Sequence, residues 1–154
     1  MKVVLLRVGR GRTTWADRAA EDFARRLSKA LPFEERLLKP APFKGDRAQV
    51  RSQEGDRIRA AIKSGDRLVL LDERGTQPST EGLAEWMTSA QRSGVRRMVF
   101  AIGGPYGHDP SLRAEAWRVL ALSKMVLNHE LARVVLVEQL YRVSTILWGG
   151  QYHH

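Results

Sequence analysis

The chain has 154 residues, a length typical of a single domain and sufficient to bury a hydrophobic core. It contains no cysteine, which excludes disulfides, cysteine nucleophiles and cysteine-ligated metals within this sequence. No apolar run approaches the roughly 20 residues of a membrane-spanning helix, and the first apolar run is too short for the core of a signal peptide. We therefore expect a soluble, cytoplasmic protein.

The formal net charge of +9 is distributed unevenly along the chain. Residues 1–64 contain 16 Lys and Arg against 8 Asp and Glu, whereas residues 65–154 contain 10 against 9. A basic excess of this kind favours a polyanion such as RNA, because neutralised phosphates release counterions. Arg10, Arg12 and Arg51 are candidate phosphate contacts. An arginine-rich surface without a specific partner is the alternative.

The first half of the chain alternates strand-like and helix-like segments. We expect a strand over 2–8, a helix over 15–30 capped by Thr14, a strand over 33–39, and a helix from Asp46 to about 64 with Gly65 as its C-terminal glycine. The proline-rich segment 40–45 predicts a loop. Gly55 costs about 1 kcal/mol relative to alanine inside a helix, which weakens the prediction that the second helix is unbroken.

The second half repeats the alternation of strands and helices. We expect strands over 67–71, 97–102 and 117–122, a turn at 72–75, a helix capped by Ser79 to about 93, a short helix after Pro110, and a long helix from Glu130 to about 149. This order predicts one α/β domain over 1–154, with a mainly parallel sheet and helices on both faces.

A glycine-rich loop follows the buried apolar strand that ends at Ile102. In Gly103-Gly104-Pro105-Tyr106-Gly107, the glycines let a ligand approach the backbone closely, and we expect Gly103 to need a positive φ. The loop matches neither a dinucleotide fingerprint nor a P-loop. Loops at the carboxyl edge of an α/β sheet commonly bind small molecules, so the glycine loop is a candidate site, with a simple turn as the alternative.

Four histidines are present, at 108, 129, 153 and 154, and none forms a spaced pair typical of a metal site. We therefore predict no metal. His129 precedes the long helix, where it could act as a base or serve as a capping or core residue.

Several short segments, in order and spacing, carry a family resemblance over the whole chain. They are Val8-Gly9; Leu71-Asp72 with Gly75 and Ser79; Ile102-Gly103-Gly104 with Gly107; Leu122-Ser123-Lys124-Met125; His129 with Arg133-Val134; Glu138-Gln139-Leu140-Tyr141-Arg142; and Tyr152-His153. Together they resemble the ribosomal large-subunit methyltransferase H family of the SPOUT class. The chain departs from that family at Asn128, where proline is usual, and at His154, where Arg or Lys is usual.

The resemblance implies a C-terminal trefoil knot, a homodimer and S-adenosyl-L-methionine as the cofactor. The activity it implies is N3-methylation of a pseudouridine in large-subunit (23S) rRNA, with the assembled ribosome as the expected substrate. Tyr152 and His153 of the C-terminal tail are expected to contact this RNA. The residues it assigns to the cofactor are Leu71, Gly103, Gly104, Leu122, Ser123, Lys124, Met125, Val126 and Leu127. The glycine loop reached above from the residues alone belongs to this set.

Methylation at N3 of a uracil ring requires that the ring nitrogen lose its proton. His129 is the candidate acceptor, and Arg133 or Arg142 could stabilise the developing anion. Glu138 is a rival base, although its spacing favours an ion pair with Arg142. A non-catalytic RNA-binding dimer and a SPOUT enzyme with a different RNA target are the alternative functions.

The long C-terminal helix has more apolar residues than one face against a sheet requires. Leu131 and the apolar positions from Val134 to Leu147, with Trp148, form this surplus. An exposed apolar stripe normally marks a partner surface, so we expect this helix to contribute to a homodimer interface.

Overall fold

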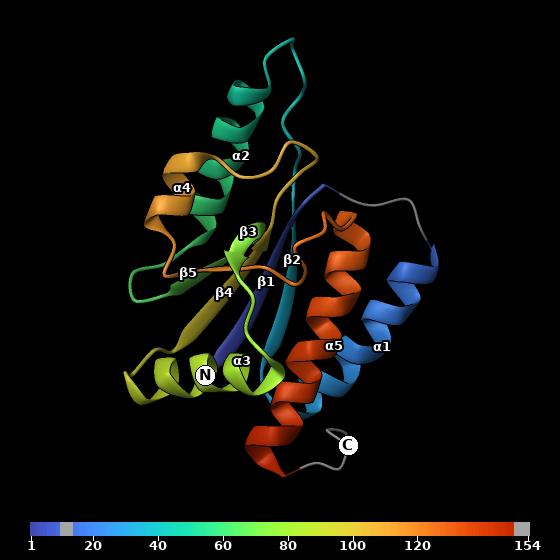
Figure 1. Cartoon of the computed structure of the whole chain (residues 1–154), viewed down its shortest axis with the longest axis vertical. Coiled ribbons are helices and arrows are strands. Elements are labelled where there is room, and N and C mark those ends of the chain that lie inside the picture. The colour runs from blue at the N-terminus through green and yellow to red at the C-terminus, as the bar shows by residue number, and fades with distance from the viewer. Residues whose placement is uncertain (10–13, 150–154) are drawn as a thin grey trace.

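All strand pairings of the central sheet are parallel, in the order β2-β1-β4-β3-β5 (Figure 1). The computed structural model describes residues 1–9 and 14–149. Its strands are β1 (Lys2–Val8), β2 (Phe33–Leu38), β3 (Arg67–Thr76), β4 (Arg97–Ile102) and β5 (Arg118–Leu120). Its helices are α1 (Thr14–Ala30), α2 (Arg47–Ala61), α3 (Thr80–Arg92), α4 (Pro110–Glu115) and α5 (His129–Trp148). The predicted parallel α/β fold is confirmed.

Helices cover both faces of the sheet, so the central strands β1 and β4 are buried on both sides. One core contains Val3, Leu5 and Phe100 packed with residues of α1, α3 and α5, such as Leu27, Met87 and Leu136. The other core contains Val4, Leu6 and Leu70 packed with Ile58 of α2 and Leu112 of α4. Alternate residues of β1 therefore point into opposite cores. Among the described residues, no helix combines the length and apolarity that a membrane span requires.

The predicted turn at 72–75 is wrong, because β3 continues through it to Thr76. After a register shift, Thr76 pairs with Leu120 of β5, and Ala121 N–H donates to Thr76 O at 2.9 Å. A Cβ on Gly75 would lie 2.5 Å from Val119 O, so glycine permits this close approach of two backbones. The pairing partner is distant in sequence, and the local turn pattern therefore misled the prediction.

Helix α2 is continuous through Gly55 and ends earlier than predicted. A Cβ on Gly55 would lie 3.3 Å from the Cβ of Asp109, so the glycine lets α2 approach the start of α4 closely. Asp46 caps the helix as expected by accepting from Ala48 N–H at 2.7 Å. Gly65 is not its C-cap, because the helix ends at Ala61 and Gly65, with φ of 85°, lies in the following turn.

Strand order and pairing do not test the trefoil knot, which stays a prediction.

A buried network of charges joins α5 to α1, β1 and β2. Arg133 is 5% exposed, and it donates to Asp17 Oδ1 at 2.6 Å and to Glu35 Oε2 at 2.9 Å. Glu35 also pairs with Arg7. Burial alone would lower the pKa of Arg133, but its contacts with Glu35 and Asp17 raise that pKa above the ordinary value. Helices α1 and α5, which lie side by side in Figure 1, are thereby fixed against the edge of the sheet.

We predict that Arg133→Met destabilises the fold by about 2–3 kcal/mol, because it leaves two carboxylates without their shared cation. The loss is smaller than for a fully buried pair, since the side chains of Asp17 and Glu35 are 30% and 19% exposed. The matched control is Arg25→Met, which removes an ion pair to Asp22 from a side chain that is 71% exposed. The control should change the unfolding free energy by less than about 1 kcal/mol. Equal urea midpoints for the two variants would contradict the prediction.

Candidate functional site

A cavity of about 540 Å³ opens at the carboxyl ends of β3, β4 and β5. Its floor contains Leu71, Ile102 and Leu120, which are neighbours across the sheet because Leu71 pairs in register with both of the others. Cavities of roughly 300–1,000 Å³ with apolar walls are typical of small-molecule sites. The parallel strands thus place an apolar floor where their following loops converge.

The walls of the cavity are the glycine loop, the segment 120–128, the start of α5 and two arginines of α2. Lys124 is absent from the lining, whereas the other residues assigned to the cofactor are present: Leu71, Gly103, Gly104, Leu122, Ser123, Met125, Val126 and Leu127. Met125 and Val126 are 74% and 79% exposed, so this part of the wall faces the solvent. Their role in cofactor binding stays a prediction.

Glycine is needed at 103 and 104 because there is no room for a Cβ, and not because the backbone has a positive φ. Neither has a positive φ, so the expectation for Gly103 is wrong, and only Gly107 in this loop has one, at 76°. A Cβ on Gly103 would lie 3.1 Å from Cε1 of the His108 ring. A Cβ on Gly104 would lie 2.6 Å from Glu54 Oε2. The two glycines therefore let the loop lie directly on two buried side chains.

His108 joins the ends of two strands beneath the glycine loop. It is 5% exposed, and its Nε2 lies 3.1 Å from the carbonyl oxygen of Leu71. Burial lowers the pKa of His108, so the ring is neutral near pH 7, and its contact with a carbonyl places the proton on Nε2. The sequence analysis did not single out His108, because one histidine in a loop has no distinctive spacing.

Glu54 supports the same loop from α2. It is 3% exposed, and its Oε1 accepts from Ala41 N–H at 3.1 Å while Oε2 lies buried against Gly104. Burial raises the pKa of Glu54. One carboxyl group therefore holds the segment before α2 and packs against the glycine loop. The sequence pattern of a polar, arginine-rich helix gave no sign of a buried carboxyl.

Asp72, unlike Glu54, lies in the cavity wall, and it is paired with arginines. It accepts from the backbone N–H of Arg74 at 3.0 Å and from Arg74 Nε at 3.1 Å, and it also pairs with Arg113. Burial alone would raise the pKa of Asp72, but these bonds from Arg74 and Arg113 lower it overall. A carboxylate held ionised by two cations is a weak proton acceptor, so Asp72 is a poor candidate base.

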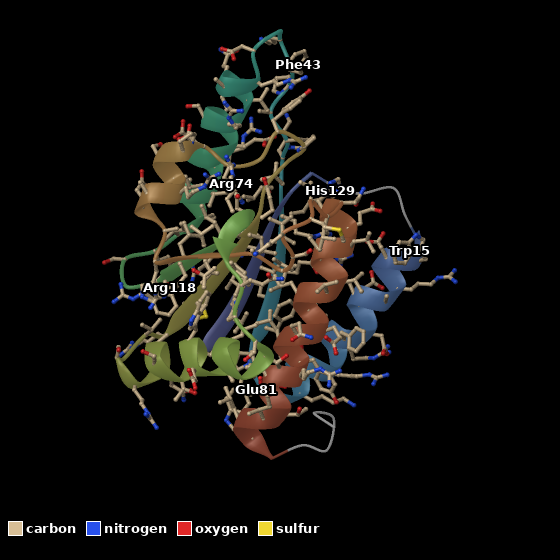
Figure 2. The ribbon with its side chains drawn as sticks, viewed as in Figure 1. Trp15, Phe43, Arg74, Glu81, Arg118 and His129 are labelled. Atoms are coloured by element: carbon tan, nitrogen blue, oxygen red, sulfur yellow. The ribbon has the colours of Figure 1, made fainter. Side chains whose placement is uncertain are left out.

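His129 is the first residue of α5 and lines the cavity. The cap of this helix is Asn128, whose Oδ1 accepts from Glu130 N–H at 2.8 Å, so His129 is not needed as a cap. The departure from proline at 128 thus supplies a helix cap. Figure 2 shows His129 at the same end of the molecule as Arg74 and Phe43.

The other predicted catalytic residues lie outside the cavity of a single chain. Arg133 belongs to the buried charge network described above. Glu138 and Arg142 form the expected ion pair, with Oε1 and Nη2 2.7 Å apart, which confirms the interpretation from spacing. Of the predicted RNA contacts, Arg51 lines the cavity. Arg10, Arg12, Tyr152 and His153 lie outside the described residues.

In the described ranges 1–9 and 14–149, no group of three or more His, Asp or Glu residues could hold a metal ion. The cavity lining offers backbone groups, the imidazoles of His108 and His129, three guanidinium groups and the carboxyl groups of Asp72 and Glu73.

We predict that Gly104→Ala destabilises the fold by about 1–3 kcal/mol, because the new methyl group would overlap Glu54 Oε2 and force α2 and the glycine loop apart. Adding Glu54→Ser removes the overlapping oxygen, so the two changes should couple favourably by more than about 0.5 kcal/mol in thermal or urea unfolding.

The matched control is Gly103→Ala, whose methyl group would meet His108 instead. Its effect should be the same with Glu54 or Ser at position 54. Purely additive effects of Gly104→Ala and Glu54→Ser would show that Glu54 does not constrain the loop.

Comparisons with known proteins agree over the full length of the chain. A family model described as "Predicted SPOUT methyltransferase" matches residues 1–153. The ribosomal RNA large subunit methyltransferase H of Geobacter metallireducens is 42% identical over 154 residues, covering 100% of this chain and 99% of the relative. The protein of the same name from Geotalea uraniireducens is 39% identical, also over 154 residues, with both chains covered completely at 100%.

Proposed function

The chain belongs to the SPOUT methyltransferase family, and from this we propose that it methylates large-subunit ribosomal RNA at N3 of a pseudouridine, using S-adenosyl-L-methionine. The observation that carries the proposal is the cavity at the carboxyl edge of the sheet. Its lining contains all but one of the residues that the family resemblance assigns to the cofactor, together with His129. Such a substrate would place the protein in the cytoplasm.

The cavity fits a nucleoside cofactor in size and in chemistry. Leu71, Ile102 and Leu120 offer an apolar floor for an adenine ring, and the backbone of 103–107 and 122–127 offers N–H and C=O groups for its polar atoms. When bound, S-adenosyl-L-methionine would supply the methyl group from its sulfonium. The chain contributes position, because methyl transfer requires an in-line approach of the acceptor nitrogen.

We propose that His129 accepts the proton that the uracil N3 must lose. This residue lines the cavity, and it does not cap α5, because Asn128 does. It lies where the wall at 125–126 faces the solvent and leaves room for an RNA base. Arg47 and Arg51 also line the cavity and can stabilise developing negative charge. Arg133 is tied to two carboxylates, so we assign it a structural role. A role for Arg142 would require that a second copy bring it to the cavity.

The test is single-turnover methylation of large ribosomal subunits from a strain that lacks the gene, with labelled S-adenosyl-L-methionine and mapping of the product. The parent should methylate N3 of one pseudouridine. His129→Ala should reduce the rate by about 10²- to 10⁴-fold, the usual contribution of a positioned base. Cofactor and subunit affinity should be unchanged, and the rate should recover partly as the pH rises and N3 ionises unaided.

Three other outcomes would change the proposal. A parental rate for His129→Ala would remove this residue as the base and leave Glu138 or solvent to accept the proton. Calorimetry that detects RNA binding but no S-adenosyl-L-methionine binding would favour the non-catalytic RNA-binding dimer. A methyl group mapped to another base would favour a SPOUT enzyme with a different target.

We further propose that the chain is a homodimer through the outer surface of α1 and α5. Exposed large apolar side chains gather on these two packed helices: Trp15, Leu131, Val135 and Trp148 are 54%, 42%, 36% and 49% exposed. Figure 2 shows Trp15 on the outer side of α1. An apolar strip of this kind is costly in water and normally marks a partner surface.

Light scattering at micromolar concentration should give twice the chain mass of 17.4 kDa. Val135→Asp should shift the protein to the monomer, because it places a charge within the apolar strip. The control Leu37→Asp changes an exposed apolar residue of β2 and should leave the dimer intact. A parent protein that elutes and scatters only as the monomer would contradict the proposal.

A further inference from the structure

Two aromatic rings and an arginine form an exposed cluster at the rim of the cavity. Phe43, in the loop before α2, is 55% exposed, and its ring centroid lies 5.5 Å from that of Tyr106 in the glycine loop, at an interplanar angle of 37°. The guanidinium carbon of Arg47 lies 5.5 Å from the Tyr106 centroid. We call Phe43, Tyr106 and Arg47 the aromatic platform.

The platform is not part of either hydrophobic core. Phe43 and Tyr106 belong to neither buried cluster nor to the side chains packed against one. Tyr106 and Arg47 instead line the cavity, with Arg51 of α2 and Arg74 of β3. Figure 2 shows Phe43 at the end of the molecule beyond Arg74. Core packing therefore does not explain why an apolar ring is held in this place.

The loop that contains Phe43 is held by hydrogen bonds to side chains of α2. Glu54 accepts from the backbone of Ala41 at 3.1 Å, and Arg57 donates to the carbonyl oxygen of Lys39. Two hydrogen bonds from α2 thus hold the chain just before Phe43. Because the ring is positioned in advance, a ligand that stacks on it loses less of its binding free energy to ordering.

The charges around the platform favour a polyanionic partner. Lys44, Arg47 and Arg51 are cationic. The nearby carboxylates have partners of their own: Asp46 caps α2, Glu54 is buried and bonded to Ala41, and Asp72 and Glu73 pair with Arg74. Cations beside an exposed aromatic face are the combination by which proteins bind single-stranded nucleic acid, with phosphates on the cations and a base on the ring. An apolar protein partner would not need the cations.

We propose that the aromatic platform stacks an unpaired RNA base that neighbours the methylated nucleotide, with Phe43 as the stacking surface. The inference rests on the proposed function, since it assumes that RNA enters the cavity whose rim the platform forms. The platform acts on RNA affinity and on the placing of the strand, and the proton of the reacting base is handled separately at His129.

The experiment measures Phe43→Ala in three assays: binding of protein-free large-subunit rRNA, KM against single-turnover rate on large subunits, and calorimetry with S-adenosyl-L-methionine. Loss of one stacked base should weaken rRNA binding and raise the KM for subunits by about 5- to 100-fold. The saturated rate and the cofactor affinity should stay within about twofold of the parent. Phe43→Trp should restore binding, because it keeps a stacking face.

Salt dependence separates stacking from phosphate contact. Phe43→Ala should leave the log–log slope of rRNA affinity against salt unchanged, whereas Arg47→Ala should flatten it by about one unit. The matched control is Leu37→Ala, an exposed apolar residue of β2 at 52% exposure, which should behave as the parent in every assay.

The outcomes are decisive in each direction. Unchanged rRNA binding by Phe43→Ala, or weakened cofactor binding in its place, would overturn the platform, the latter because the rings would then cover the cofactor. If the parent binds rRNA without methylating it and Phe43→Ala weakens that binding, the platform stands and the proposed methylation falls. If the parent neither binds rRNA nor methylates large subunits, both fall.

Discussion

The register of three parallel strands determines where everything else in the site lies. Leu71 pairs with Ile102 of β4 and with Leu120 of β5, so β4 and β5 both end beside Leu71, and the loops that follow them meet over a common floor. A shift of one residue in any strand would turn its side chains to the opposite core and remove one side of the floor. The register of these strands therefore also determines the position of the cavity.

The loops above this floor are held by polar groups that are themselves buried. His108 bonds the carbonyl of Leu71, Glu54 bonds the backbone of Ala41, and both side chains press against the glycines of the loop. Polar groups inside a protein are costly unless they are bonded, so each of these side chains has few alternative positions. The same carboxyl group that supports the glycine loop also fixes the segment that presents Phe43. Cavity and platform thus share one supporting side chain.

Local patterns were sufficient for most elements, and they failed where a distant residue decides the outcome. Asp46 and Ser79 cap their helices as expected, because a cap needs only residues within one turn. The turn predicted at 72–75 is instead strand, because β5 supplies the pairing. Likewise, Gly104 was recognised as a point of close approach, but what approaches it from within the protein is Glu54, which lies fifty positions earlier. Arg133 is among the catalytic residues predicted from the sequence, and nothing local reveals Asp17 and Glu35 as its partners.

Neighbouring residues of α5 face three different surroundings, so the rotation of the helix about its own axis determines what each of them contacts. His129 faces the cavity, Leu131 is exposed beside α1, and Arg133 is buried among carboxylates. Apolar packing alone tolerates small rotations of a helix, since hydrophobic contacts have little directional preference. Hydrogen bonds from one guanidinium to carboxylates on α1 and β2 do not, because they have fixed geometry. Arg133 therefore sets the rotation of α5, and through it the direction in which His129 points and the surface that Leu131 offers to a partner. A residue outside the cavity lining can in this way position His129 without contacting the cavity.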